Sequence, residues 1–172
     1  MRKINVEVSG ISPLLINKFV HEPSTRKKKT YVPEEEAEKK VYRNNDGKCF
    51  VPTKNFKAAM TKAGSDFTMS GRKKYKEYIK SGIFFESEEA MLEPSEYIIH
   101  EEPVNIQGAM VLSWRPKFVD WKATFAMMIT DDMLDKNVVK EILEAAGAYK
   151  GVGSYRPEYG RFKVDKFEEV KL

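Results

Sequence analysis

Residues 151–164 are Gly151-Val152-Gly153-Ser154-Tyr155-Arg156-Pro157-Glu158-Tyr159-Gly160-Arg161-Phe162-Lys163-Val164, and they join a segment with a helical pattern to one with a strand pattern. We call residues 151–160 the glycine loop. Glycine permits positive φ and close approach of another chain, whereas proline fixes φ and removes an amide donor. Two arginines beside two tyrosines suit a phosphodiester strand with stacking bases. The alternative is a helix C-cap at Gly151 and a turn at 157–160 that bind no ligand.

The composition is that of a folded cytoplasmic protein. The chain has 172 residues, 41% hydrophobic and 33% charged, which suits a single domain with a real core. No apolar run approaches the roughly 18 residues of a membrane span, and the N-terminus leads straight into a strand pattern. The single Cys49 excludes an internal disulfide and agrees with a reducing compartment. The net charge of +4 permits nucleic-acid binding without requiring it.

Hydrophobic periodicity predicts the order of the elements. Ile4, Val6 and Val8 alternate with polar residues, as on one face of a strand. Apolar spacing predicts helices at 53–63, with Thr53 as N-cap, and at 134–148, capped by Asp131 or Asp132. Further strands are expected at 82–86, 97–106, 110–115, 121–130 and 161–170, with 110–115 and 121–130 joined as a hairpin.

This order predicts an α+β protein with a ferredoxin-like, RRM-like βαββαβ core, in which an antiparallel sheet has two helices on one face. We expect one domain over 1–172, with an extra hairpin and polar insertions at about 20–48 and 65–81. Residues 34–40 of the first insertion have i,i+4 charge pairs typical of a short helix.

Two basic groups are candidate phosphate-binding elements, and a third stretch forms another basic surface. The run Arg26, Lys27, Lys28 and Lys29 could clamp a phosphate backbone, although such runs are more often solvated loops. Lys54 and Lys57 lie near the start of the predicted helix 53–63, where free amides attract anions; ordinary surface lysines are the alternative. Residues 72–80 form another basic stretch whose tyrosines have helical spacing, which favours packing.

Three local patterns resemble the repeat-associated mysterious protein (RAMP) superfamily, which includes CRISPR backbone and repeat-processing proteins. They are Gly10-Ile11-Ser12-Pro13-Leu14-Leu15 after the first strand, the stretch 47–59 that opens the first long helix, and the glycine loop. Two features depart from the family pattern: Pro52-Thr53-Lys54 stands where the family often has proline, glycine and serine, and the final loop is poorer in glycine.

The resemblance implies a subunit that binds single-stranded RNA and polymerises along it as a homo-oligomeric filament. RNA is favoured over DNA only through this resemblance. We therefore predict a non-catalytic, single-stranded nucleic-acid-binding protein. The predicted contact residues are Arg26, Lys27, Lys28, Lys29, Lys54, Lys57, Tyr155, Arg156 and Arg161, assisted by the backbone amides of Gly151 and Gly153.

Two other functions remain open. Some RAMP proteins cut RNA, so His21 could act as the acid or base of a metal-independent endoribonuclease, with a lysine stabilising the phosphorane; His100, in a strand pattern, is expected to be structural. A non-enzymatic assembly protein with an acidic protein partner is the third possibility. No metal or cofactor is expected, because residues 34–38 lack histidine and cysteine and neither a P-loop nor a GxSxG motif occurs.

Overall fold

The computed structural model describes residues 1–22 and 30–171. Its larger sheet contains the strands β1 (Arg2–Gly10), β3 (Phe50–Pro52), β6 (Ile83–Phe85), β7 (Glu89–Glu93), β10 (Lys122–Ile129) and β11 (Phe162–Val170). The strand order is β11-β1-β10-β7-β3, β6 also pairs with β10, and all these pairs are antiparallel. The two strands nearest the chain ends, β1 and β11, are therefore neighbours in space.

The alternation of apolar and polar residues in β1 places its apolar side chains on one buried face, as predicted. Ile4, Val6 and Val8 are completely buried, and Val6 and Ile4 pair with Phe125 and Met127 of β10 on the same face. A β-bulge interrupts the pairing of β1 with β11 between Glu7 and Val8. Because side chains alternate with period 2, this bulge shifts the register by one residue, so Phe162, Val164 and Phe167 of β11 all contact the core.

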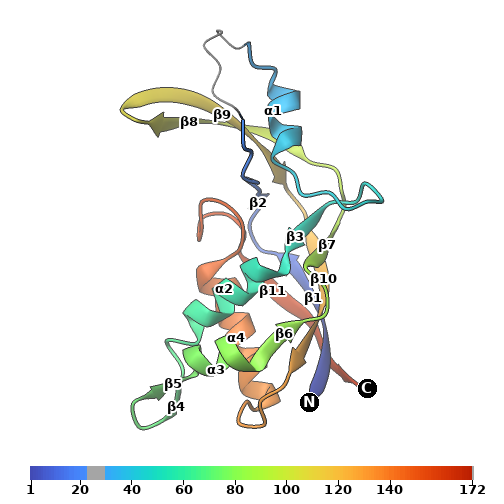
Figure 1. The fold of residues 1–172 in the computed structure, drawn as a ribbon, viewed down its shortest axis with the longest axis vertical. Coiled ribbons are helices and arrows are strands. Elements are labelled where there is room, and N and C mark those ends of the chain that lie inside the picture. The colour runs from blue at the N-terminus through green and yellow to red at the C-terminus, as the bar shows by residue number, and fades with distance from the viewer. Residues whose placement is uncertain (23–29, 172) are drawn as a thin grey trace.

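Helices α2 (Thr53–Ala63), α3 (Tyr75–Gly82) and α4 (Lys136–Ala145) lie on one side of this sheet (Figure 1). A short π-helical segment, η1 (Ala146–Lys150), continues α4 toward the glycine loop. Phe56 of α2 joins helix to sheet, since its ring centroid lies 4.6 Å from that of Phe125 and 5.4 Å from that of Phe162. The protein thus has the predicted α+β class.

The predicted helix caps are wrong. Thr53 is the first residue of α2 rather than its N-cap, and its hydroxyl donates to the carbonyl oxygen of Ser87 over 2.9 Å. The cap of α4 is Asp135, whose carboxylate accepts hydrogen bonds from the amides of Asn137 and Val138. Asp131 instead accepts from the amide of Met133 in the preceding turn, which delays the start of the helix.

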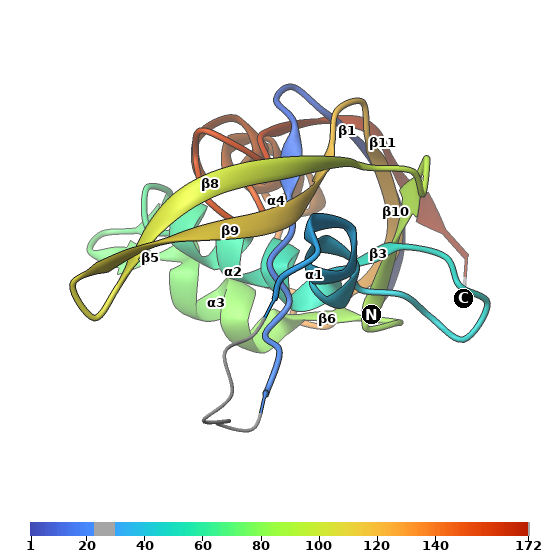
Figure 2. The same ribbon diagram turned by 90° about the horizontal axis from the view of Figure 1, so that it is seen from above.

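The second sheet is a long hairpin of β8 (Ile98–Ile106) and β9 (Ala109–Phe118), with β2 (Leu14–Leu15) paired to β9. Figures 1 and 2 show it extending beyond the larger sheet. The predicted hairpin of 110–115 with 121–130 is wrong, because β10 pairs with β1 instead. The physical reason is the two-residue turn at Gln107 and Gly108, both with positive φ, which closes the hairpin one strand earlier.

Each predicted insertion contains regular structure. The helix expected at 34–40 is present as α1 (Pro33–Lys39), which contacts β9 (Figure 2). Residues 65–81 include the two-stranded sheet of β4 (Thr68–Ser70) and β5 (Lys73–Lys74) and most of α3. The basic run Arg26–Lys29 lies outside the described residues. None of the helices in 1–22 and 30–171 is long and apolar enough to cross a membrane.

Candidate nucleic-acid interface

The glycine loop is hydrogen bonded to the segment that follows β1. The amide of Ser154 donates to the carbonyl oxygen of Leu15, and the amide of Gly160 donates to that of Pro13, each over 2.8 Å. Within the loop, the amide of Val152 donates to the oxygen of Gly160 over 3.0 Å. The loop is therefore held by the Pro13–Leu15 segment, one of the stretches on which the family resemblance rests.

Glycines at 153 and 160 are required by this packing. Both have φ near +80°, where side chains are strained, and a Cβ at Gly153 would lie 2.4 Å from the oxygen of Leu15. A Cβ at Gly160 would lie 1.7 Å from the oxygen of Val152. The amide of Gly151 already donates to the oxygen of Ala146 over 2.9 Å. Some of the glycines in the loop are therefore explained by its packing. The groups that could bind a ligand are mainly the side chains of the loop and its neighbours.

Those side chains border a groove of about 520 Å³ between α2, η1 and the glycine loop, lined by Lys62, Tyr149, Lys150 and residues 153–157. Tyr149 is 68% exposed and Tyr155 41% exposed, so both rings are accessible to a base. Tyr155 has φ of 52°, an uncommon value for a residue with a side chain. Two tyrosines and several cations thus meet at one accessible groove.

The cations in the groove differ in their partners. Lys150 is 3.2 Å from a carboxylate oxygen of Asp66. Within the described part of the chain, Lys62 and Arg156 make no hydrogen bond or ion pair through their side chains. Because nothing in the described residues neutralises these two charges, they are available for a phosphate.

The predicted contact residues are not all brought together. Tyr155 and Arg156 line the groove. Arg161 is adjacent in the chain, but its Nε donates to the carbonyl oxygen of Ala148 over 2.8 Å, and its amide donates to the hydroxyl of Ser12. Arg161 therefore ties the end of the loop to η1 and to the segment after β1.

Lys54 and Lys57 lie near the other end of α2. Lys54 lines a separate pocket of about 320 Å³ that includes Glu88 and Glu89, whose carboxylates disfavour an anion. Lys57 donates to the carbonyl oxygen of Ile83, and burial lowers the pKa of its amine. Eight residues of helix separate Lys54 from Lys62, which is about 12 Å along the axis. Lys62 is accordingly the lysine of α2 that reaches the glycine loop.

The two histidines occupy different environments. His21 is exposed, beside the undescribed residues 23–29, so its proposed role in cleavage stays a prediction. His100 lies on β8 with its Nε2 2.5 Å from a carboxylate oxygen of Glu102, and its ring centroid is 5.7 Å from that of Tyr159. This contact joins the hairpin to the glycine loop and agrees with a structural role. No cluster of metal-binding side chains occurs among the residues that the structure describes.

The hairpin also contacts the glycine loop through β9. The guanidinium carbon of Arg115 is 4.7 Å from the ring centroid of Tyr155, and its Nη1 donates to the hydroxyl of Ser154 over 3.1 Å. The amine of Lys117 lies 5.8 Å from the ring centroid of Tyr159. The sequence patterns did not identify Lys62, Tyr149, Lys150 and Arg115, because these residues belong to three elements, α2, η1 and β9, which only the packing brings to the loop.

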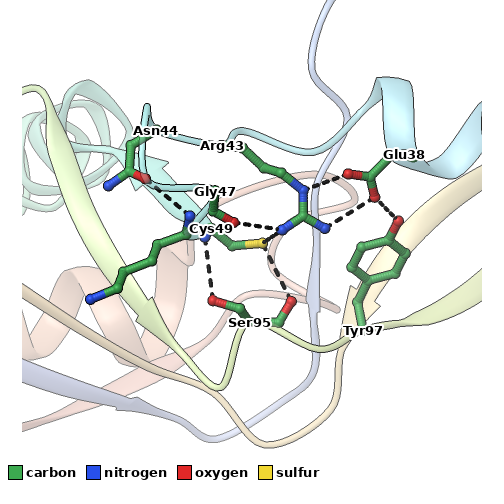
Figure 3. A network of polar contacts seen from close by, with 8 residues as sticks. Glu38, Arg43, Asn44, Gly47, Cys49, Ser95 and Tyr97 are labelled. Carbon is green, nitrogen blue, oxygen red and sulfur yellow. Dashed lines mark hydrogen bonds and ion pairs between the residues drawn. The ribbon is translucent and has the colours of Figure 1, made fainter.

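A polar network fixes the base of the hairpin (Figure 3). Arg43 donates through Nε and Nη2 to both carboxylate oxygens of Glu38, and the hydroxyl of Tyr97 donates to the same carboxylate. Arg43 also donates to the carbonyl oxygen of Gly47 over 2.9 Å. These bonds connect α1, the loop before β3 and the residue that precedes β8. They hold the start of the hairpin against α1.

The open face of the larger sheet is less suited to bases. On β1 it presents Lys3, Asn5 and Glu7, and on β10 Lys122 and Thr124. These five positions carry no aromatic ring, and the rings that do lie on this face, Phe84 of β6 and Phe50 of β3, already contact Lys57 and Tyr42. At the glycine loop, two exposed rings lie beside two cations that have no partner in the described residues.

Comparison with known proteins gives a likeness of fold. The chain is similar to one chain in the cryo-EM structure of the Type III-B Cmr-beta bound to cognate target RNA, with 11% sequence identity and a TM-score of 0.57. The match covers 99% of this chain and 61% of the other, so this chain spans about three fifths of that chain's length. No family model matches the sequence, and no curated protein matches it.

Proposed function

We propose that this chain binds a single strand of RNA in the groove beside the glycine loop, as a RAMP-type subunit with a ferredoxin-like core. The strand order β11-β1-β10 with β6 and β7 on the far side of β10 supports that core, as do α2 and α4 on one side of the sheet. The likeness to a chain in an RNA-bound complex supports RNA as the ligand. We treat residues 1–172 as one domain of this kind.

The observation that carries the proposal is the pair of unneutralised cations beside two exposed rings. Lys62 and Arg156 supply charge for phosphates, and Tyr149 and Tyr155 supply faces for stacking. Stacking of a base on an aromatic side chain contributes about 1–3 kcal/mol and tolerates any sequence. The groove therefore fits a flexible strand whose bases are unpaired, rather than a duplex.

The direct test measures the affinity of a fluorescently labelled oligouridylate by anisotropy over a range of salt concentrations. The double variant Lys62→Met/Arg156→Met removes the two free charges. We expect weaker binding. The salt slope, which is the slope of the logarithm of the binding constant against the logarithm of the salt concentration, should also be less steep, by about 0.7 for each phosphate that the variant no longer neutralises. Lys140→Met is the control, because that lysine is exposed on α4 and lies 3.7 Å from Glu144. Equal affinity in the double variant and the wild type would contradict the proposal.

Polymerisation along the strand is the second part of the proposal. The hairpin exposes apolar side chains that a lone chain leaves in water: Met110 is 66%, Ile106 55% and Leu112 48% exposed. Such a patch is typical of a surface that meets another protein chain. Negative-stain imaging with and without a long RNA would show filaments only with RNA, and single particles in both samples would refute this part.

A further inference from the structure

Arg115 of β9 has an unsatisfied charge. Its Nη1 donates to the neutral hydroxyl of Ser154, and its guanidinium stacks on Tyr155. Its Nε is buried and has no hydrogen-bond acceptor in the described part of the chain. Leaving a buried donor unpaired is destabilising, and more so when the group is charged. An anion that bonds the other N–H groups of this guanidinium would compensate its charge.

A second cation lies close to Arg115. Lys40 follows α1, and its amine donates to the hydroxyl of Ser113 over 3.0 Å and to the carbonyl oxygen of Trp114 over 2.9 Å. Burial lowers the pKa of Lys40, and the positive charge of Arg115 lowers it further. Both partners of Lys40 are neutral, so neither removes the repulsion between the two cations.

The nearby carboxylates are bonded elsewhere. Glu36 and Glu22 attract Lys40 at longer range, but both bond Lys39, at 2.8 and 3.0 Å. Neither Lys40 nor Arg115 forms an ion pair in residues 1–22 and 30–171. Residues 23–29 contain no aspartate or glutamate, so that segment cannot supply a carboxylate. Glu102, opposite Ser113 on β8, lies 2.5 Å from His100. Among the residues that the structure describes, Lys40 and Arg115 are therefore two partly buried like charges without an ion pair of their own.

We propose that Lys40 and Arg115 form a phosphate-binding site between α1, the hairpin and the glycine loop. Arginine can bond phosphate oxygens through two N–H groups, and lysine adds a point charge. Tyr155 connects this site to the groove, since its ring stacks on Arg115 while the residue also lines the groove. In the RNA-bound protein, the site holds a backbone phosphate next to the base at Tyr155. That assignment rests on the proposed function, whereas phosphate binding itself does not.

The first experiment tests the site with inorganic phosphate alone. The thermal unfolding midpoint is measured in sodium phosphate and in sodium chloride of equal ionic strength, for wild type, Lys40→Met, Arg115→Met and Arg115→Lys. A ligand that binds only the folded state raises the midpoint. We expect phosphate to raise the midpoint of the wild type, and the two methionine variants to lose most of that rise. Arg115→Lys retains the charge and should keep part of it.

Lys39→Met is the matched control, because it removes the same charge one residue away from a lysine that already has two carboxylate partners. It should retain the full phosphate effect. The proposal fails if phosphate has no specific effect on the wild type, or if its effect is the same in all variants. Far-UV circular dichroism identifies any variant that does not fold. If Arg115→Met does not fold, the phosphate effect on Arg115→Lys, compared with that on the wild type, tests the role of Arg115.

The second experiment separates this site from the proposed function. With labelled oligouridylate, Lys40→Met and Arg115→Met should each weaken binding about tenfold and lower the salt slope by about 0.7. If the wild type binds phosphate but no oligouridylate, the RNA function fails and the phosphate site stands. If the wild type binds the oligonucleotide and the two variants bind it equally well, the RNA function stands and this site is refuted as part of it.

Discussion

Gly160→Ala is expected to detach the glycine loop from the segment after β1. The new Cβ would lie 1.7 Å from the carbonyl oxygen of Val152, so the backbone must move, and the hydrogen bonds of Gly160 with Val152 and Pro13 would be broken. Two hydrogen bonds at about 1 kcal/mol each, together with about 1–2 kcal/mol for alanine at positive φ, give a destabilisation of about 3–4 kcal/mol.

Gly108→Ala is the control for this prediction. Gly108 has φ of 84°, close to the 79° of Gly160, but a Cβ at this position in the hairpin turn would have no atom within 4 Å. The substitution introduces the conformational strain without the clash, so it should cost only about 1–2 kcal/mol. Urea denaturation of both variants, followed by tryptophan fluorescence, measures the difference. Equal destabilisation of the two variants would refute the argument that close backbone packing requires glycine at 160.

Three other predictions concern the core, the groove and the hairpin base. Phe56→Ala should lower the free energy of unfolding by about 3–5 kcal/mol, because the ring is buried between sheet and helices; a loss below about 1 kcal/mol in urea denaturation would contradict that. Tyr155→Ala should weaken oligouridylate binding about tenfold or more while Tyr155→Phe retains it, and anisotropy titrations showing equal losses would exclude stacking. Hydrogen bonds from Arg43 hold the pKa of the Glu38 carboxyl below its ordinary value of 4.5. The ionised Glu38 therefore contributes its full stabilisation above pH 4.5, and this contribution is lost as the pH falls through the lowered pKa. Unfolding measured at neutral and acidic pH should show a weaker acid dependence in Glu38→Gln than in Glu34→Gln, and identical profiles would count against this role.

Local sequence patterns determined much of the core. The alternation of Ile4, Val6 and Val8 and the apolar spacing of 53–63 predicted β1 and α2 correctly, because burial of one face follows directly from a period of 2 or 3.6. The α+β class followed from the order of such segments. The position of the glycine loop between a helical segment and a strand was also predicted correctly.

Tertiary structure alone decided the partners of these elements. The pattern of β10 identifies its buried face but not its neighbour, so its pairing with β1 rather than with β9 could not be derived from it. Likewise, Lys54, Lys57 and Lys62 have the same chemistry, and only the packing of α2 brings Lys62 to the glycine loop while Lys57 bonds β6. Periodicity is a property of each segment, whereas a binding groove depends on distances between segments, and those are set by the core that the segments form together.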